Sequence, residues 1–134
     1  MKKLLLFVFL ISGFIFQACE EDEEVCQSYA YSPIVDAQSP DTLELNIAEY
    51  VQVAYTLENT CGDINFLQID SLGDDTLSFQ VRAIYEGCDC NEILLTDTIS
   101  YFYTPLDAGR KYLKFVSPDS SFFYDTLFVV DPEG

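Results

Sequence analysis

From residue 25 onward the chain alternates apolar and polar side chains in short runs, and this period of two constrains its fold more than any other feature. Successive side chains of a β-strand point to opposite faces, so the alternation predicts strands with one buried and one solvent-facing side. No stretch after residue 25 has the period of an amphipathic helix. Two runs show the strand pattern most clearly: Val51, Val53, Tyr55 and Leu57 share one face, and Leu77, Phe79, Val81, Ala83 and Tyr85 share another.

Turn-forming residues interrupt this alternation at near-regular spacing. Clusters of Pro, Gly, Asn, Asp and Ser lie at 39–41, 58–63, 70–75, 86–91, 104–109 and 117–121, and such clusters separate strands. They delimit seven or eight expected strands: 29–38, 41–47, 50–58, 64–70, 76–86, 93–103, 111–116 and 122–130. The count is seven if the first two form one split strand. We therefore predict an all-β fold for residues 29–134, a single antiparallel Greek-key β-sandwich.

The second half of this region resembles bacterial immunoglobulin-like or fibronectin-like domains. The resemblance rests on Leu106-Asp107-Ala108-Gly109 leading into Tyr112-Leu113-Lys114-Phe115, and on the closing run Asp125-Thr126-Leu127-Phe128-Val129-Val130. In that family, a Tyr two residues after the Gly braces the corner. Here that position is Lys111, and Tyr112 follows one place later. A closed β-barrel and a jelly roll are alternative arrangements of the same strands.

Residues 1–18 have the pattern of an export signal: two lysines, an apolar run from Leu4 to Phe16, and a small residue, Ala18. As a helix the run would reach only about 20 Å, short of the roughly 30 Å hydrocarbon layer. The end of the signal resembles a bacterial lipobox, which implies that Cys19 is lipidated and becomes the new N-terminus. The alternative is a plain secretory signal followed by an incidental thiol.

Five consecutive acids, residues 20–24, follow Cys19. Such a run is a solvated tether rather than part of a core, so we assign residues 19–28 to a lipidated Cys with an acidic tether. The run resembles the acidic export signal of Bacteroidetes-type surface lipoproteins, which implies an outer-membrane, surface-exposed, lipid-anchored protein. The alternative is a spacer that repels the membrane surface. Lys2 and Lys3 keep the rest of the chain outside the cytoplasm even without cleavage.

Four further cysteines, Cys26, Cys61, Cys88 and Cys90, are an even number and predict two structural disulfides in an exported chain. Two expected strands separate Cys61 from Cys88 and Cys90, which places all three at the same pole of an antiparallel sandwich. Cys26 joins them if residues 29–47 form one split strand. A bridge from Cys88 to Cys90 would close too small a ring. We expect Cys61 to pair with Cys88 or Cys90, and Cys26 with the other. The alternatives are a redox-active Cys88-Asp89-Cys90 pair and a zinc site.

Charge and composition exclude several functions. The formal net charge is −17, with 23 acidic and 6 basic residues, and such a surface repels nucleic acid, which we exclude as a partner. The absence of His removes the usual hydrolase sites, so we predict no enzymatic activity, no cofactor and no metal. Asp70, Asp74 and Asp75 crowd one turn around Gly73 and offer calcium as an alternative.

We accordingly predict a non-catalytic lipoprotein held at the membrane by its lipid anchor and contacting an envelope protein or forming part of an envelope assembly. A glycan-binding accessory lipoprotein is the alternative, because exposed aromatic rings can stack on sugars. Two aromatic runs could supply them, 101–103 and 122–124, although alternation sends half of these rings into the core. A bridged Cys26 would turn the disulfide pole toward the lipid and the 104–109 end away from it.

Overall fold

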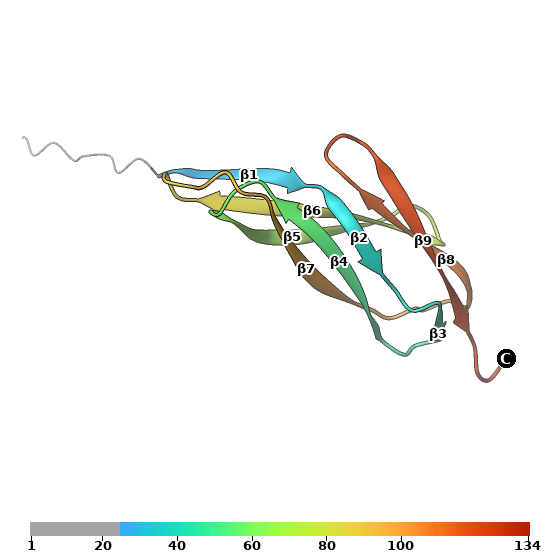
Figure 1. Cartoon of the computed structure of the whole chain (residues 1–134). Helices are drawn as coiled ribbons and strands as arrows, with labels where there is room; N and C mark the ends of the chain where they lie inside the picture. The colour runs from blue at the N-terminus through green and yellow to red at the C-terminus, as the bar shows by residue number, and fades with distance from the viewer. Residues whose placement is uncertain (1–24) are drawn as a thin grey trace, which may run out of the picture.

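The computed structural model describes residues 25–134, which form nine strands in two sheets (Figure 1). In chain order the strands are β1 Gln27–Ser32, β2 Ile34–Gln38, β3 Thr42–Glu44, β4 Glu49–Leu57, β5 Gly62–Ser71, β6 Thr76–Glu86, β7 Leu95–Tyr103, β8 Gly109–Val116 and β9 Phe122–Val130. The described chain begins at one end of an elongated molecule and finishes at the other. The all-β prediction is confirmed.

The smaller sheet is antiparallel, in the order β2-β4-β7, and the larger sheet has six strands arranged around β6. β5 pairs with one edge of β6. The other edge is shared, because β1 pairs antiparallel with residues 81–86 and β8 pairs parallel with residues 76–79. β9 continues the sheet beyond β8, and β3 pairs parallel with β9. The larger sheet is therefore mixed.

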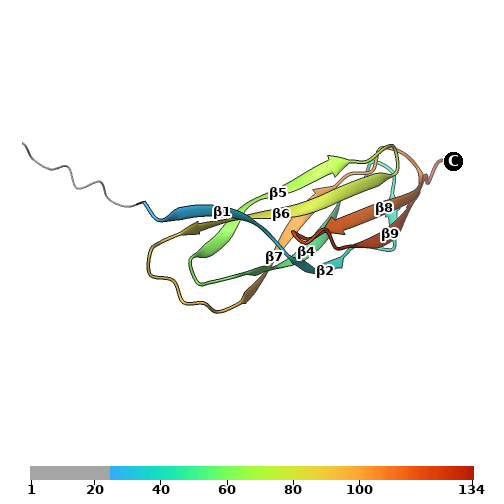
Figure 2. The same cartoon turned by 90° about the horizontal axis from the view of Figure 1, so that it is seen from above.

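The prediction of a purely antiparallel, immunoglobulin-like Greek-key sandwich with seven or eight strands is wrong in this respect. The chain breaks at Pro33, which has no N–H for a sheet ladder, and there it leaves β6 and joins β4 in the other sheet as β2 (Figure 2). The expected strand 29–38 is thus two strands. β7 also crosses to the smaller sheet before β8 returns beside β6, so that β6 and β8 run in the same direction.

The core lies between the two sheets and consists of the predicted inward faces. Val51, Val53 and Tyr55 on β4, and Phe79, Val81 and Ala83 on β6, are at most 1% exposed. Leu113, Phe115 and Leu127 from the β8–β9 hairpin complete the centre. Phe79 stacks on Phe115 with ring centroids 5.1 Å apart. Period-two alternation therefore predicted the inward faces of β4 and β6, although Leu77 at the start of β6 is only partly buried.

Two disulfides close one pole of the domain. Cys26 is bridged to Cys88, and Cys61 to Cys90, with Cα atoms 5.1 and 5.5 Å apart. This pairing is one of the two that the sequence left open. Gly87 lies between the bridges at a φ of 134°, where a Cβ would come within 2.9 Å of the Cys61 sulfur. Because cytosolic thiols stay reduced, the two disulfides indicate an extracytoplasmic protein.

Candidate functional site

The basic side chains of the domain are few, and they are not spread evenly. Residues 25–134 carry 18 acids and 4 bases, a net charge of −14. Three of the four bases, Arg82, Arg110 and Lys114, lie at positions on the outer face of the larger sheet, opposite to the core. Each also lies over an aromatic ring. Cations and aromatic rings are therefore concentrated together on one face of an acidic domain.

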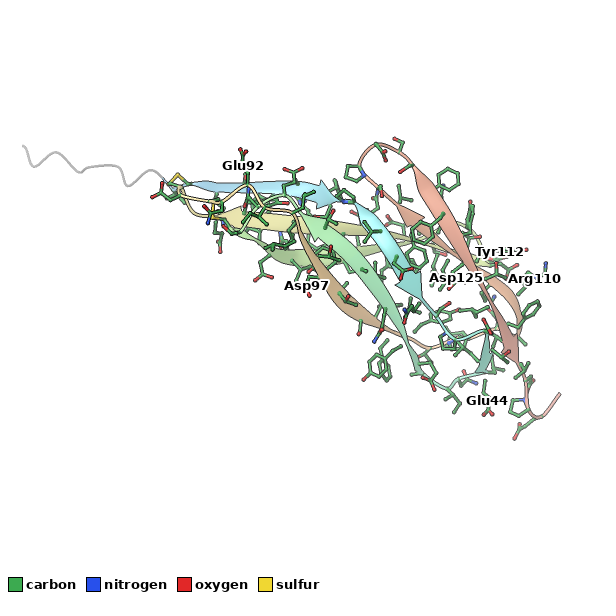
Figure 3. All side chains as sticks on the ribbon, in the orientation of Figure 1. Glu44, Glu92, Asp97, Arg110, Tyr112 and Asp125 are labelled. Atoms are coloured by element: carbon green, nitrogen blue, oxygen red, sulfur yellow. A yellow bond between two sulfur atoms is a disulfide. The ribbon has the colours of Figure 1, made fainter. Side chains whose placement is uncertain are left out.

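The β8–β9 hairpin carries most of this group. Its outward positions alternate with the buried ones, and we call the following six the hairpin face: Arg110, Tyr112, Lys114, Phe122, Tyr124 and Phe128. All four aromatic residues among them are 37% to 53% exposed. The Arg110 guanidinium lies 4.9 Å from the centre of the Phe128 ring, and the Lys114 ammonium 4.2 Å from that of Phe122. Figure 3 shows Arg110 and Tyr112 projecting from β8 away from the smaller sheet.

No carboxylate stands at an outward position of β8 or β9. The one acid within these two strands, Asp125, pairs in register with the buried Leu113 and accepts a hydrogen bond from the Ser39 hydroxyl. On the neighbouring strand β3, Glu44 lies opposite Val130 at the border of the sheet. The hairpin face is thus locally positive within a strongly negative domain.

An open hollow of about 360 Å³ lies in the middle of the hairpin face, lined by Thr76, Tyr112, Tyr124 and Thr126. Thr76, Tyr112 and Thr126 form one cross-strand row over β6, β8 and β9, while Tyr124 belongs to the next row, beside Lys114. Within residues 25–134, none of these four side-chain hydroxyls makes a hydrogen bond to the protein. The hollow therefore offers two aromatic walls and four free hydroxyl groups.

A smaller group of the same kind lies on the outer side of β1, β5 and β6. The Arg82 guanidinium is 5.2 Å from the centre of the Tyr29 ring and 5.6 Å from that of Phe66. Tyr31 lies opposite Arg82 on β1, and its hydroxyl donates to the Gln68 side chain at 3.0 Å. Here the cation is already enclosed by two rings, so this group offers less free surface than the hairpin face.

Lys111 is the fourth base, and it points inward. Its side chain is 7% exposed; the ammonium donates to Asp75 Oδ1 at 2.7 Å and to the Asp74 carbonyl at 3.3 Å. The hydrogen bond to Asp75 raises the pKa of Lys111 against the opposing effect of burial. At the position where the resembled family has a bracing Tyr, this chain ties the β5–β6 turn to β8 with a lysine, while Tyr112 faces solvent.

Other displaced pKa values also belong to structural contacts. Burial, followed by the charge of Asp97, raises the pKa of Tyr55 to about 12, and the Tyr55 hydroxyl donates to Asp97 at 3.4 Å. Burial likewise raises the pKa of Tyr103. Donation from the Ser121 hydroxyl and backbone lowers the pKa of Asp119. None of these three groups lies on the hairpin face.

The structure bears on several of the sites that were predicted from the sequence. Cys19 lies outside the described residues. Cys88 and Cys90 are each bridged to a distant cysteine rather than to each other, so they do not form a redox pair. Of the acids proposed for calcium, Asp75 holds Lys111 and Asp70 accepts a hydrogen bond from Gln68 at 2.7 Å. No cluster of metal-binding side chains occurs in residues 25–134.

The first aromatic run divides as alternation predicts, and the second does so only in part. Tyr101 and Tyr103 pack on the core, while Phe102 faces outward and meets Tyr50 edge-on at 4.4 Å. Phe123 stacks on the core residue Phe115 but is still 37% exposed, and its neighbours Phe122 and Tyr124 are each 53% exposed. β8 also places Tyr112 between two cations, Arg110 and Lys114, on this same face, which was not predicted from the sequence. The sequence indicates this arrangement, because the alternate positions 110, 112 and 114 of one strand are Arg, Tyr and Lys.

Comparison with known proteins gives no relative: no protein-family model, no curated protein and no solved structure matches this chain. In residues 25–134 there is also no helix with the length and apolar character needed to cross a membrane.

Proposed function

We propose that the protein is a lipid-anchored lipoprotein, exposed at the outer membrane, that acts as a non-catalytic interaction module of the cell envelope through its hairpin face. The observation that carries the proposal is the hairpin face itself, where four exposed aromatic rings and two cations gather without a carboxylate in a domain of net charge −14. Exposed aromatic and arginine side chains with few acids are typical of binding surfaces.

The sequence supports the membrane anchor, and the disulfides support export from the cytoplasm. The signal pattern ends at Ala18-Cys19, and the two bridges are typical of an exported chain. From Cys19 to Val25 the chain spans at most about 20 Å when extended, and Val25 lies next to Cys26 at the disulfide pole. A lipid on Cys19 would hold that pole close to the membrane, with the β8–β9 hairpin available along the side of the domain.

The chemistry of the acidic groups supports a non-catalytic role. Glu58 and Asp119 line an open hollow between the β1–β2 break and the tip of the β8–β9 hairpin, together with Tyr31 and Ser117. A general acid needs a carboxyl pKa raised toward neutrality, whereas the pKa of Asp119 is lowered. With no His in the chain, binding is the better supported function.

Two experiments test this proposal. For the anchor, Cys19→Ser should abolish incorporation of radiolabelled palmitate and move the protein from the membrane to the soluble fraction. A Cys19→Ser protein that stays lipidated and membrane-bound would refute the anchor.

For the binding face, a photo-reactive phenylalanine analogue can replace either Tyr112 or Tyr50 in the full-length protein in the envelope. Tyr50 is a stringent control, because it is 56% exposed against 37% for Tyr112 and lies on the outer side of the smaller sheet. We expect a discrete cross-linked product from position 112 and none from position 50. Equal or greater labelling at position 50 would contradict the assignment of the hairpin face.

A further inference from the structure

We propose that the hairpin face binds an anionic glycan, a short oligosaccharide of carboxylated sugars, with one sugar ring seated in the hollow between Tyr112 and Tyr124. This inference rests on the proposed function and names the chemical class of its ligand. It follows from three features of the face: the aromatic walls of the hollow, its unpaired hydroxyls, and the cations on either side of it.

The hollow has the two kinds of group that a sugar ring requires. A pyranose presents C–H groups that pack on aromatic rings, and hydroxyls that need hydrogen-bond partners. Tyr112 and Tyr124 supply the rings, and Thr76 and Thr126 add hydroxyls from the strands on either side of β8. Because these hydroxyls bond to no other described residue, a sugar can pair with them without breaking any contact of the fold.

The cations flank the hollow along β8. Arg110 and Lys114 are two residues before and after Tyr112, so each stands about 7 Å from it along the strand, and the two are about 13 Å apart. Both are held over rings, by Phe128 and Phe122, which limits the side-chain freedom lost on binding. A short oligosaccharide across the hollow can reach both with its carboxylates.

The charge of the domain limits the length of the ligand and predicts a salt dependence. A net charge of −14 repels a long polyanion, but at physiological ionic strength charges farther than about 8 Å are largely screened, while contacts with Arg110 and Lys114 are not. Affinity should therefore rise when salt is added to a very dilute buffer, and then fall again at high salt as the direct ion pairs weaken.

A glycan fits this face better than a folded protein does. A stable protein–protein contact buries an apolar centre and about 800 Å² on each partner. Phe122 and Phe128 each have a cation over one side, Lys114 and Arg110, and the outward aliphatic side chains, Val116 and Val130, lie at the two ends of the hairpin. The middle of the face is instead lined by hydroxyls.

The test uses the full domain with its disulfides and two matched probes: a short oligogalacturonate and the same oligosaccharide with its carboxyls converted to methyl esters. The probes share their sugar rings and differ in charge. Calorimetry in 0.15 M salt should give at least about tenfold tighter binding for the acid form, the effect expected of one charge-assisted hydrogen bond.

The variants separate the two parts of the site. Tyr112→Ala should weaken binding of both probes about tenfold, since it removes one wall of the hollow. The double variant Arg110→Gln and Lys114→Gln should abolish the preference for the acid form, because the affinity for the acid falls to about that for the ester. Tyr50→Ala and Arg82→Gln are the matched aromatic and cationic controls, and neither should change binding. Thermal unfolding of each variant checks that the fold is retained.

Each outcome decides the inference. It is overturned if the ester binds as well as the acid, if the double variant keeps the acid preference, or if the controls weaken binding as much as the hairpin variants do. A cross-link from position 112 to an envelope protein, without binding of either probe, overturns the glycan and leaves the proposed function standing. If neither a cross-link nor probe binding is found, both proposals fail.

Discussion

Removing the disulfides one at a time tests how the bridged pole stabilises the domain. Cys26→Ala with Cys88→Ala removes the bridge that spans 62 residues, and Cys61→Ala with Cys90→Ala removes the one that spans 29. Each pair of substitutions leaves the other bridge intact. The two bridges are not independent, because Cys88 and Cys90 are neighbours in the chain.

The expected cost follows from the loops that the bridges close in the unfolded chain. For a loop of 29 residues the loss of chain entropy corresponds to about 3.6 kcal/mol. With Cys61–Cys90 retained, the path from Cys26 to Cys88 runs through that bridge and shortens to about 37 residues, worth about 3.8 kcal/mol. The two bridges together are then worth about 7.4 kcal/mol. Because Cys26–Cys88 alone closes 62 residues and is worth about 4.3 kcal/mol, removing Cys61–Cys90 should cost about 3.1 kcal/mol, against about 3.8 kcal/mol for removing Cys26–Cys88.

The assay is urea unfolding followed by tyrosine fluorescence. With a slope of about 1.5 kcal/mol per molar, each variant should lose roughly 2 to 3 M in its midpoint. Removing both bridges should cost about 7 kcal/mol, comparable with the whole stability of a small domain, so the cysteine-free chain should be largely unfolded.

Hydrogen exchange adds a local expectation. β1 buries one side chain, Ser32, and pairs along one edge with β6, so losing Cys26–Cys88 should expose the amides of β1 first. A midpoint that does not move when either bridge is removed would refute the entropy argument. Non-reducing peptide mapping that joins Cys88 to Cys90, or Cys26 to Cys61, would refute the pairing.

Three further predictions concern the core and the turns. Asp75→Asn should lower the free energy of unfolding by about 1 to 2 kcal/mol, because it leaves the buried Lys111 ammonium without its counter-charge. In a double-mutant cycle with Lys111→Met, the loss in the double variant should be smaller than the sum of the two single losses, and strict additivity would show that the pair is not coupled. The pKa of Tyr55 is raised to about 12, so the phenol is neutral in the folded and the unfolded state below pH 10, and between pH 10 and about 12 it ionises first in the unfolded chain. The melting temperature should therefore fall across this pH range, and it should fall less in Tyr55→Phe. Parallel pH profiles of the two proteins would refute the assignment. Gly87→Ala should destabilise the domain by roughly 1 to 3 kcal/mol, because it combines a positive φ with a contact of 2.9 Å to the Cys61 sulfur, and an unchanged melting temperature would count against this.

The candidate site was only partly predictable from the sequence. The outward positions of β8 and β9 follow from alternation, so the exposure of Tyr112 and Tyr124 could be read from the pattern. Their meeting with Thr76 in one hollow could not, because it depends on the parallel pairing of β6 with β8. The inward position of Lys111 is similar: alternation assigns its face, and the turn at Asp75 supplies its partner from a distant strand.

The sequence by itself determined the local properties of this protein: strands with a buried and an exposed side, the turns between them, and an acidic surface. These properties depend on neighbouring residues and on a period of two, which the chain carries in its own order. Only the tertiary structure decided which strand lies beside which. Sheet switching at Pro33 and the return of β8 beside β6 depend on which strand edges are left unpaired. The pairing of strand edges depends on residues far apart in the sequence, so the alternation within each strand does not predict it. This pairing places Thr76 of β6 beside Tyr112 and Tyr124 of the hairpin face.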